Sequence, residues 1–399
     1  MEERSALDRA PVGQGPGKIE WARSRLRLLG RLQEEFRATR PFAGLTIGIC
    51  LHVEPKTAVL CGAFQAGGAE VVITGSPGTT QDDVADALRG TGALVFGAQK
   101  DDAANHLENV RMVLRREPHL ILDNGADLAA GLVADPEINR VIAGTEETTT
   151  GANRLREELR GALSFPVIVI NDSPLKLIME NEHGVGPTVV EGFMRATNLL
   201  VPSKRFVVFG YGSVGRGIAK CLRSLGARAG VVEPDPIRAL EAALDGMLVV
   251  STKEALKNGE VFITATGRPG VIVGEHFGQL PDGAILANAG HFAWEIDLAE
   301  LRRQASGHDR LSQHVEVFTL PDGRRITLLA RGEMLNLAGG GGNPVETMDL
   351  GLALQALSML YLVRHHRELA PGPQAVPAEI NFEVARSMVE LLSRGQSWS

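Results

Sequence analysis

Residues 206–220 of the chain have the sequence Phe206-Val-Val-Phe-Gly-Tyr-Gly-Ser-Val-Gly-Arg-Gly-Ile-Ala-Lys220, which combines an apolar run, spaced glycines and a helical pattern. Its first four residues are apolar and predict a buried strand, while the apolar residues that follow recur at helical spacing. Glycines stand between the two patterns, at Gly210, Gly212 and Gly215. They allow a tight turn, the approach of a pyrophosphate to the backbone, and close packing of strand against helix. The helix N-terminus offers free N–H groups to the phosphate, so the stretch predicts a dinucleotide-binding unit.

An acidic residue at the expected distance identifies the dinucleotide. A second apolar stretch ends in Glu233, 21 residues after Gly212. A carboxylate at this place binds the ribose diol and disfavours a 2′-phosphate. The predicted cofactor is therefore NAD rather than NADP.

The length, composition, net charge and cysteine count of the chain argue against several classes of protein. With 399 residues and 44% hydrophobic content, the chain should form two or more domains. A net charge of −7 without a basic block argues against nucleic acid and membrane surfaces as partners. The three cysteines (Cys50, Cys61 and Cys221) suggest free thiols in a reducing compartment. The N-terminus is acidic and lacks a signal-peptide pattern, and the apolar stretch 350–363 is too short to span a bilayer, so we expect a cytoplasmic protein.

Strand and helix patterns alternate along most of the chain. Strands are predicted at 45–50, 70–74, 93–97, 120–123, 141–143 and 167–171, and later at 247–250, 261–264, 284–288 and 325–329. Helices are predicted at 19–40, 56–65, 81–88, 102–115, 148–163 and 188–199. The alternation predicts an α/β fold with two doubly wound parallel sheets, each with its site at the carboxyl ends of the strands.

We expect the chain to pass between two domains at two points. They lie near 183–187 and at the glycine run Ala338-Gly-Gly-Gly-Gly-Asn-Pro344. We expect an NAD-binding Rossmann domain at 186–340, inserted into a substrate-binding and catalytic domain at 18–185. Helices within 341–399 should return to that first domain.

Ordered motifs over roughly residues 40–365 resemble one family, the adenosylhomocysteinases (S-adenosylhomocysteine hydrolases). The matching stretches are Leu51-His52 with Thr57-Ala-Val-Leu60, Thr80-Gln-Asp-Asp83, Glu146-Glu-Thr-Thr-Thr-Gly151, Asn171-Asp-Ser with Lys176 and Asn181, Gly210-Tyr-Gly-Ser-Val-Gly215, Glu233-Pro-Asp-Pro236, Asn288-Ala-Gly-His-Phe292 with Glu295-Ile-Asp297, and Asn336-Leu337. The resemblance implies transient oxidation of the 3′ carbon of a nucleoside by bound NAD, removal of the 4′ proton, and β-elimination of the 5′ substituent. Water then adds, the hydride returns, and NAD is recycled.

The resemblance also implies roles for individual residues. Lys176 would polarise the 3′ hydroxyl and Glu180 would orient it, while Glu147 and Thr148 would bind the sugar hydroxyls. His52 would act at the 4′/5′ side and His291 near the 5′ group. The residues expected to line NAD are Thr148, Thr149, Thr150, Asn181, Gly210, Gly212, Ser213, Val214, Gly215, Glu233, Arg238, Thr266, Ala289, Gly290 and Asn336.

Each assignment has a structural alternative. The acids and threonines at 146–150 fit a capped helix N-terminus, Lys176 and Glu180 fit a surface i, i+4 pair, and the two histidines fit hydrogen-bonded core groups. We predict no metal site, because no His, Cys or carboxylate cluster has ligand spacing.

The departures from the family pattern cluster at the substrate. The family's Asp-Asp-Gly-Gly-Asp becomes Asp123-Asn124-Gly-Ala-Asp127, and the Asn124 amide cannot transfer a proton. The family's glutamate before Thr57, which receives the adenine amino group, is Lys56, with Glu54 two residues earlier. Ser76 stands near the expected homocysteine portion in place of an asparagine, and Asn343 replaces the histidine of the second hinge.

We therefore expect a divergent paralogue that takes a small nucleoside and acts as a dehydratase. It would release water and leave a 4′,5′-unsaturated nucleoside, as in the biosynthesis of nucleoside antibiotics. Two alternatives stay open: an adenosylhomocysteinase that hydrolyses S-adenosylhomocysteine, and a non-catalytic regulator that binds NAD or adenosine. The resemblance implies a homo-oligomer, a tetramer or a dimer. The last lysine is Lys257 and the last tyrosine is Tyr361, so the C-terminal Lys and Tyr that the family delivers to a neighbouring subunit's NAD have no counterpart, and one link between subunits is lost.

Overall fold

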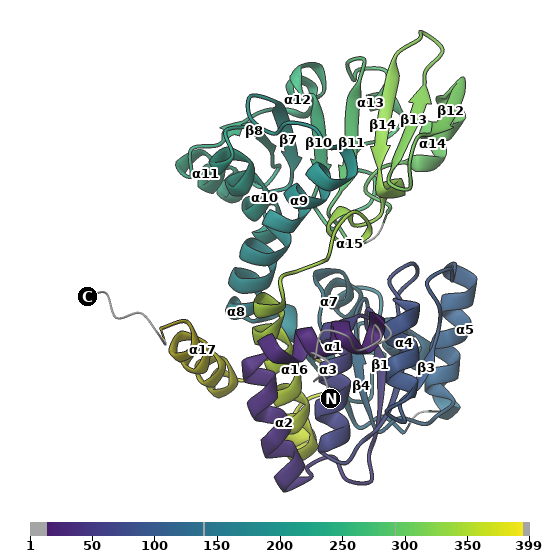
Figure 1. The fold of residues 1–399 in the computed structure, drawn as a ribbon, viewed down its shortest axis with the longest axis vertical. Helices are drawn as coiled ribbons and strands as arrows, with labels where there is room; N and C mark the ends of the chain where they lie inside the picture. The colour runs from purple at the N-terminus through teal and green to yellow at the C-terminus, as the bar shows by residue number, and fades with distance from the viewer. Residues whose placement is uncertain (1–13, 139, 292, 394–399) are drawn as a thin grey trace, which may run out of the picture. The chain divides into compact units, whose positions relative to one another are not determined.

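The computed structural model describes residues 14–138, 140–291 and 293–393, and the chain forms two compact units (Figure 1). The first unit runs up to Lys176 and resumes at Met348, and the second comprises Leu177–Thr347. The second unit is thus inserted into the sequence of the first. The N-terminal residues 1–13, which entered the expectation that no signal peptide is present, lie outside the described residues.

The first unit is built on a seven-stranded parallel sheet. Its strands are β1 (Thr46–Cys50), β2 (Glu70–Thr74), β3 (Leu94–Phe96), β4 (Leu120–Asp123), β5 (Ala143–Glu146), β6 (Pro166–Val169) and β15 (Gly372–Ala375), in the order β15-β6-β5-β4-β1-β2-β3. Every neighbouring pair is parallel. The strand order reverses between β1 and β4, and this switch point is where doubly wound sheets bind ligands.

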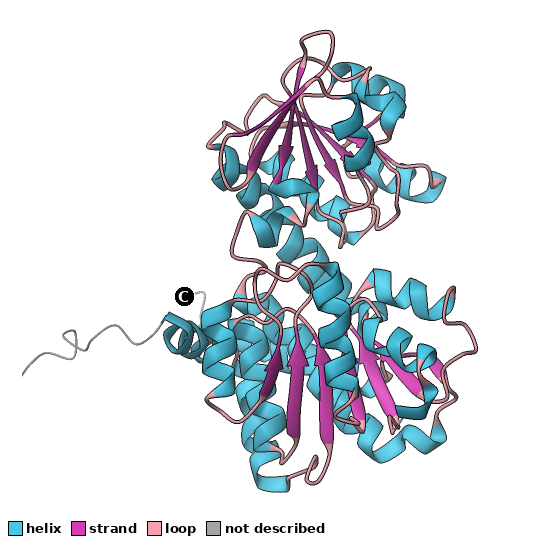
Figure 2. Cartoon of the chain, turned by 90° about the vertical axis from the view of Figure 1, so that its right-hand side faces the viewer, coloured by secondary structure: helices cyan, strands magenta, loops and turns pink. Residues whose placement is uncertain are grey.

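Helices pack against the strands of each sheet (Figure 2). In the first unit they are α1 (Gln14–Arg25), α2 (Arg27–Thr39), α3 (Pro55–Ala66), α4 (Asp82–Arg89), α5 (Ala103–Leu114), α6 (Asp127–Ala134), α7 (Thr149–Arg156), α8 (Pro174–Lys176), most of α16 (Val345–His365) and α17 (Ala378–Ser393).

The single helix predicted at 19–40 is wrong, because α1 and α2 are separate. The Asp349 carboxylate accepts hydrogen bonds from the backbone N–H groups of Leu28 (2.8 Å) and Leu29 (2.9 Å), so a distant segment caps the start of α2. The helix predicted at 148–163 ends early, at Arg156.

The second unit contains an eight-stranded sheet. Its strands are β7 (Arg205–Phe209), β8 (Arg228–Val232), β9 (Leu248–Val249), β10 (Val261–Thr264), β11 (Ala284–Asn288), β12 (Gly307–Arg310), β13 (Val315–Thr319) and β14 (Arg325–Leu329), in the order β12-β13-β14-β11-β10-β7-β8-β9. The strands from β14 to β9 are parallel and reverse their order between β7 and β10, while β12 and β13 add an antiparallel edge that the sequence did not predict. The predicted fold class is therefore confirmed.

The helices of the second unit surround this sheet. They are a π-helix, η4 (Leu177–Val185), followed by α9 (Gly186–Thr197), α10 (Ser213–Ser224), α11 (Pro236–Leu244), α12 (Thr252–Asn258), α13 (Gly274–Phe277), α14 (Leu298–Gln304) and α15 (Leu335–Ala338). The three cysteines are free thiols, as predicted. Among the described helices, none is both long and apolar enough to cross a bilayer.

Candidate active site

The switch point of the first sheet gathers many of the predicted substrate residues. Strand β1 is followed by His52 and, at the start of α3, by Glu54, Lys56 and Thr57. Strand β4 lies beside β1 and is followed directly by Asn124. Because parallel strands bring their carboxyl ends to one edge, these side chains share the edge where a ligand is expected.

Glu54 and Lys56 form a buried ion pair at this edge. The Lys56 Nζ and Glu54 Oε2 atoms are 2.7 Å apart, and the two side chains are 6% and 12% exposed. Burial raises the pKa of the Glu54 carboxyl, an effect that Lys56 opposes and the nearby Glu147 carboxylate reinforces. The pair places an ammonium donor and a carboxylate acceptor together, a combination suited to reading the polar edge of a ligand.

Asn124 and Glu147 form a second buried pair. The Asn124 Nδ2 group donates to Glu147 Oε2 at 3.1 Å. Among the described residues, the Asn124 Oδ1 atom and the Ser76 Oγ atom are buried without a hydrogen-bond partner. Buried polar atoms are normally hydrogen-bonded, so these two are well suited to contact a ligand.

The threonines that follow Glu147 begin helix α7. Thr148 is the N-cap: its Oγ1 accepts from the Gly151 N–H (2.9 Å) and donates to Glu146 Oε1 (2.8 Å). This geometry shows the capping role that the sequence left as an alternative. One lone pair of the Thr148 hydroxyl remains for a sugar or cofactor group, and Thr149 and Thr150 form the first turn of the helix.

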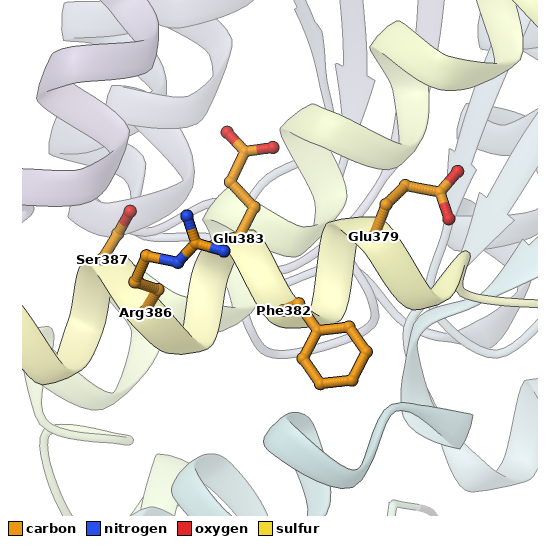
Figure 3. A pocket seen from close by; sticks show the side chains of 5 residues that line it. All are labelled: Glu379, Phe382, Glu383, Arg386 and Ser387. Carbon is orange, nitrogen blue, oxygen red and sulfur yellow. The ribbon is translucent and has the colours of Figure 1, made fainter.

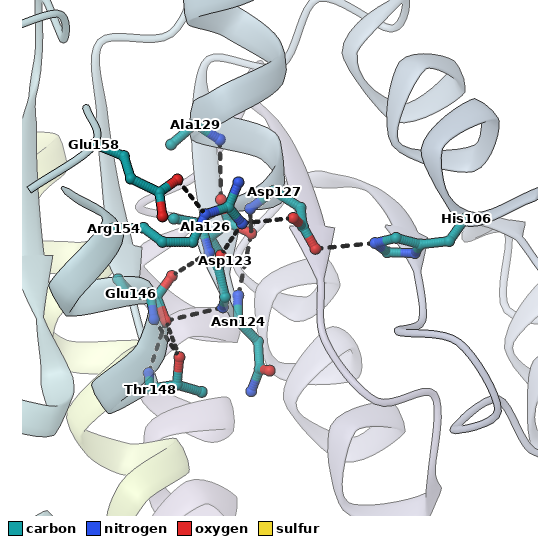
Figure 4. Close-up of polar contacts among 12 residues, drawn as sticks. His106, Asp123, Asn124, Ala126, Asp127, Ala129, Glu146, Thr148, Arg154 and Glu158 are labelled. Atoms are coloured by element: carbon teal, nitrogen blue, oxygen red, sulfur yellow. Dashed lines mark hydrogen bonds and ion pairs between the residues drawn. The ribbon is translucent and has the colours of Figure 1, made fainter. Parts of the chain in front are cut away.

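A buried charged network that the sequence analysis missed lies next to these residues (Figure 4). Asp123 accepts from the N–H groups of Asn124 (3.1 Å) and Ala129 (2.9 Å), and Glu146 accepts from those of Gly125 (3.1 Å) and Ala126 (2.9 Å). Burial raises the pKa values of Asp123 and Glu146, which are cross-strand neighbours. Repulsion from Asp127 adds to the shift of Asp123, and repulsion from Asp123 adds to that of Glu146.

The same network includes two cations. Asp127 bonds to Arg154 Nη1 at 2.8 Å and to His106 Nε2 at 3.0 Å. Although burial alone would raise the pKa of Asp127, these two partners lower it. The sequence contained a pattern that could have identified His106, because it stands at helical spacing from the apolar Val110 and Val113. The structure places all three on the buried face of α5.

Cys50, His106 and Asp127 are the described residues that come closest to a metal-ligand cluster, with potential ligand atoms within 4.8 Å of one another. Both ring nitrogens of His106 already bond to oxygen acceptors, at the Gly75 carbonyl and at Asp127. Burial and the neighbouring carboxylates also raise the pKa of the Cys50 thiol, so the thiolate that a metal needs is disfavoured. The cluster is therefore better suited to hydrogen bonding than to holding an ion.

Lys176 and Glu180 do not form the surface helical pair that was the alternative interpretation. Lys176 ends α8 and Glu180 lies in the π-helix η4, and both side chains are buried, as is Asn181. π-Helical segments are rare and are frequently found at functional sites. Burial of three polar residues in this segment favours the functional interpretation.

In the second unit, the glycine-rich turn has the geometry that a dinucleotide needs. Gly210 has φ +97°, which suits glycine, and a Cβ on Gly215 would lie 2.0 Å from the Gly210 carbonyl oxygen. A Cβ on Gly212, in contrast, would come no closer than 3.8 Å to another group, the Arg238 guanidinium. Gly212 caps α10 without a side-chain bond, so the first N–H groups of the helix, from Ser213 to Gly215, are available to a phosphate.

The remaining NAD candidates also lie at the carboxyl edge of this sheet. Glu233 directly follows β8 and accepts from the Tyr211 N–H at 2.6 Å, beside the glycine turn. Thr266, Ala289, Gly290 and Asn336 follow β10, β11 and β14, with His291 next to Gly290. Among the described residues, the buried Asn336 Oδ1 atom has no hydrogen-bond partner. The turn, the Glu233 carboxylate and this orphaned oxygen together fit NAD.

Glu295 holds two of these loops in place, a role that the motif did not reveal. It accepts from the N–H groups of Thr266 (3.0 Å) and Gly267 (2.8 Å), and a Cβ on Gly290 would lie 1.8 Å from its Oε1 atom. Asn343 packs beside Gly184 of the π-helix, within the same unit.

A surface pocket on α17 contains none of the predicted site residues. It is lined by Glu379, Phe382, Glu383, Arg386 and Ser387, all from one helix (Figure 3). Because a single exposed helix forms it, the pocket has no link to the chemistry at the sheet edges.

Two models of one protein family match the chain. The model described as "S-adenosyl-L-homocysteine hydrolase, NAD binding domain" matches residues 181–342, and the model described as "S-adenosyl-L-homocysteine hydrolase" matches residues 7–143. The first match confirms the predicted NAD-binding domain.

Three relatives match over nearly their whole length. S-inosyl-L-homocysteine hydrolase of Methanopyrus kandleri is 45% identical over 393 residues, covering 97% of this chain and 93% of the relative. Adenosylhomocysteinase of Archaeoglobus fulgidus is 45% identical over 381 residues (94% of each chain), and that of Thermotoga maritima is 43% identical over 387 residues (96% and 95%). These matches favour the hydrolase alternative, and the predicted dehydratase in antibiotic biosynthesis finds no support.

Proposed function

The chain belongs to the S-adenosyl-L-homocysteine hydrolase family of NAD-dependent enzymes, and from this premise we propose that it hydrolyses S-inosyl-L-homocysteine to inosine and homocysteine. Residues 18–185 with 341–399 would bind the substrate and residues 186–340 would bind NAD. The substitutions at the substrate edge then mark a change of base rather than a change of reaction.

The buried Lys56–Glu54 pair is the observation that carries this choice. The family resemblance implies that the residue before Thr57 recognises the 6-position of the purine, where the family's glutamate accepts from the adenine amino group. Lys56 places an ammonium donor there, held 2.7 Å from Glu54. A donor matches the 6-oxygen of hypoxanthine and opposes the 6-amino group of adenine, and buried sites discriminate strongly between such groups.

The chain's own residues would then share the proton work. When bound, NAD supplies the acceptor for the 3′ hydride and later returns it. The Lys176 ammonium would donate to the 3′ oxygen and favour its alkoxide character, with Glu180 orienting that hydroxyl. Glu147, which Asn124 holds at 3.1 Å, would accept from a sugar hydroxyl. Asn181, Thr149 and Thr150 would contact the cofactor.

Proton transfer at the departing sulfur falls to the two histidines. Asn124 cannot donate a carboxyl proton, so its amide would orient Glu147 and, through its free Oδ1 lone pairs, accept from the substrate. His52 would act at the 4′ and 5′ carbons, and His291 would act near the 5′ sulfur. Ser76 would hydrogen-bond the amino-acid portion, and Thr57 and Asn343 would complete the substrate contacts.

Hydrolysis of S-adenosyl-L-homocysteine is the second candidate. It is favoured by Glu54, whose carboxylate could accept from an adenine amino group at the same edge. Purified enzyme should be mixed with each thioether and a thiol reagent, and homocysteine release followed. The proposal requires release from the S-inosyl compound that is faster than any release from the S-adenosyl compound. Faster turnover of the S-adenosyl compound would establish the second candidate, and release from neither would reject both.

We also propose that the chain forms a homo-oligomer through α17. This helix exposes Phe382, Val389 and Leu392, at 71%, 62% and 58% of their surface. Apolar surface of this kind is typical of contact sites. Light scattering should show a dimer or tetramer that the Phe382→Asp variant dissociates, and a monomeric wild-type protein would contradict the proposal.

A further inference from the structure

His106 bridges two segments of the substrate edge. It lies on the buried face of α5, where its Nδ1 atom is 3.0 Å from the Gly75 carbonyl oxygen and its Nε2 atom is 3.0 Å from Asp127 Oδ2. Gly75 belongs to the loop that follows β2, and Asp127 begins α6. The ring therefore ties the β2 loop to the turn that carries Asn124.

The two partners dictate the protonation of the ring. A carbonyl oxygen and an ionised carboxylate only accept hydrogen bonds, so both ring nitrogens must donate, as they do only in the imidazolium form. Arg154 keeps Asp127 ionised from its other side, through a bond of 2.8 Å. Burial would lower the pKa of His106, but the bond and charge of Asp127 and the Gly75 carbonyl outweigh burial and raise it.

The segment that His106 holds is the one that positions Ser76. A Cβ on Gly75 would lie 2.3 Å from Thr80 Oγ1, so this loop is tightly folded. Its far end is fixed by the Gln81 N–H, which donates to the Val53 carbonyl at 2.9 Å. Among the described residues, the buried Ser76 Oγ has no partner, and its place follows directly from that of Gly75.

We propose that the doubly protonated ring of His106 is a positioning group that holds Ser76 at the substrate edge, so that substrate affinity falls when the ring loses its second proton. This inference rests on the proposed function, in which Ser76 contacts the amino-acid portion of the thioether. The neutral ring has one donor only, and its bare nitrogen would face an oxygen acceptor. The remaining proton stays on Nε2, because its bond to the ionised Asp127 carboxylate is stronger than a bond to a neutral carbonyl, so the bond to Gly75 is the one that is lost.

Other ionisable groups around the ring would not produce the same pH dependence. Asp127 and Arg154 stay charged across neutrality, because the pKa of Asp127 is lowered and that of Arg154 is raised. Cys50 stays a thiol. Asp123 would add negative charge beside the ring as pH rises, which retains the second proton and therefore opposes the loss.

Two isosteric variants separate the two bonds. In His106→Asn the side-chain N–H group replaces Nδ1, keeps the bond to Gly75 at every pH, and gives up Asp127. In His106→Gln the side-chain N–H group replaces Nε2, keeps the bond to Asp127 and loses the bond to the Gly75 carbonyl. With S-inosyl-L-homocysteine, we expect KM of the wild type to rise with pH, KM of His106→Asn to stay flat, and KM of His106→Gln to be about tenfold higher throughout, with smaller changes in kcat.

His119 provides the matched control. It lies at the opposite edge of the same sheet, where its Nδ1 accepts from the Thr46 N–H at 3.0 Å, so His119→Asn should keep the wild-type profile. Equal KM values in His106→Gln and wild type, or the same rise of KM with pH in His106→Asn as in wild type, would overturn the proposal. If His106→Gln unfolds at the assay temperature, the comparison of His106→Asn with wild type decides alone.

A measurement without substrate separates this inference from the proposed function. Deuterium uptake of residues 75–81, corrected for the intrinsic effect of pH, should increase with pH in the wild type and stay constant in His106→Asn. If neither thioether is hydrolysed but this pattern appears, the positioning role stands and the proposed function fails. If turnover occurs and uptake does not depend on residue 106, the positioning role fails.

Discussion

Exchange of the Glu54–Lys56 pair should change which base the enzyme accepts. Replacing Lys56 alone would leave the Glu54 carboxylate buried without its cation, at a cost of about 3–5 kcal/mol in folding stability. The double variant Glu54→Gln/Lys56→Gln avoids this cost, because two amides of similar volume can hydrogen-bond as a neutral pair. A second double variant, Glu54→Gln/Lys56→Glu, restores the family's acid at position 56 while avoiding two adjacent carboxylates.

The magnitude follows from the burial of the pair. A hydrogen bond to a charged group is worth about 1.5–3 kcal/mol, which corresponds to roughly 10- to 150-fold in rate or affinity. We expect the wild type to favour the S-inosyl over the S-adenosyl thioether by a factor in this range in kcat/KM. The neutral pair, which can donate or accept, should bring the ratio to within about fivefold. The variant with Glu at position 56 should reverse the preference.

The assay is homocysteine release from both thioethers at one pH, with a thiol reagent in excess. The bound NAD content serves as a control, since the pair lies in the first unit, and the temperature of unfolding shows whether each variant is folded. An unchanged ratio in both folded double variants would show that the pair does not contact the base and would refute the reasoning.

Three further predictions follow from other parts of the molecule. Gly215→Ala should destabilise the second unit by about 1–3 kcal/mol and reduce NAD retained on purification, because its Cβ would lie 2.0 Å from the Gly210 carbonyl oxygen. Gly212→Ala should keep the wild-type free energy of unfolding, because no protein atom lies closer than 3.8 Å to its Cβ, and equal destabilisation of the two variants would contradict this. Lys176→Gln should lower kcat by at least about a hundredfold while NAD content stays the same, as judged by mass spectrometry of the released cofactor; full activity would remove Lys176 from the mechanism. The free energy of unfolding in urea should fall as pH rises from about 5 to 8, because His106, Asp123 and Glu146 have raised pKa values and the folded state binds more protons than the unfolded state; a rise over this range would contradict the assigned shifts.

The fold could be predicted because local patterns and global topology agree. The glycine turn after β7 is specified by three residues whose geometry needs no distant partner, and β2, β4, β10 and β11 have the predicted bounds. The separation of α1 from α2 could not be foreseen, because its cause is Asp349, more than three hundred residues away. Strand β15 was missed because its sequence, Gly372–Ala375, has little apolar character and is held by pairing with β6.

The candidate site shows the same division. Asn124 and Lys56 were identified from the resemblance to the family, as departures from its motifs. Their interaction partners could not be predicted. Asn124 bonds to Glu147, which lies after a different strand, and the ion pair of Lys56 with Glu54 is recognised only once both side chains are seen to be buried. The dehydratase hypothesis relied on the replacement of an acid by Asn124. It did not consider that Lys56 introduces a cation where the base is expected to bind.

The insertion of one unit into the other has a consequence for synthesis on the ribosome. The first unit needs Asp349 to begin α2 and needs β15 to complete its sheet, yet both emerge only after the whole of residues 177–347 has been translated. The first unit therefore cannot complete its fold until the last part of the chain has been translated. The second unit contains all the strands of its own sheet within residues 177–347 and can fold before then. A truncated chain that ends at residue 347 and has been released from the ribosome should have a protease-resistant second unit and a digestible first one.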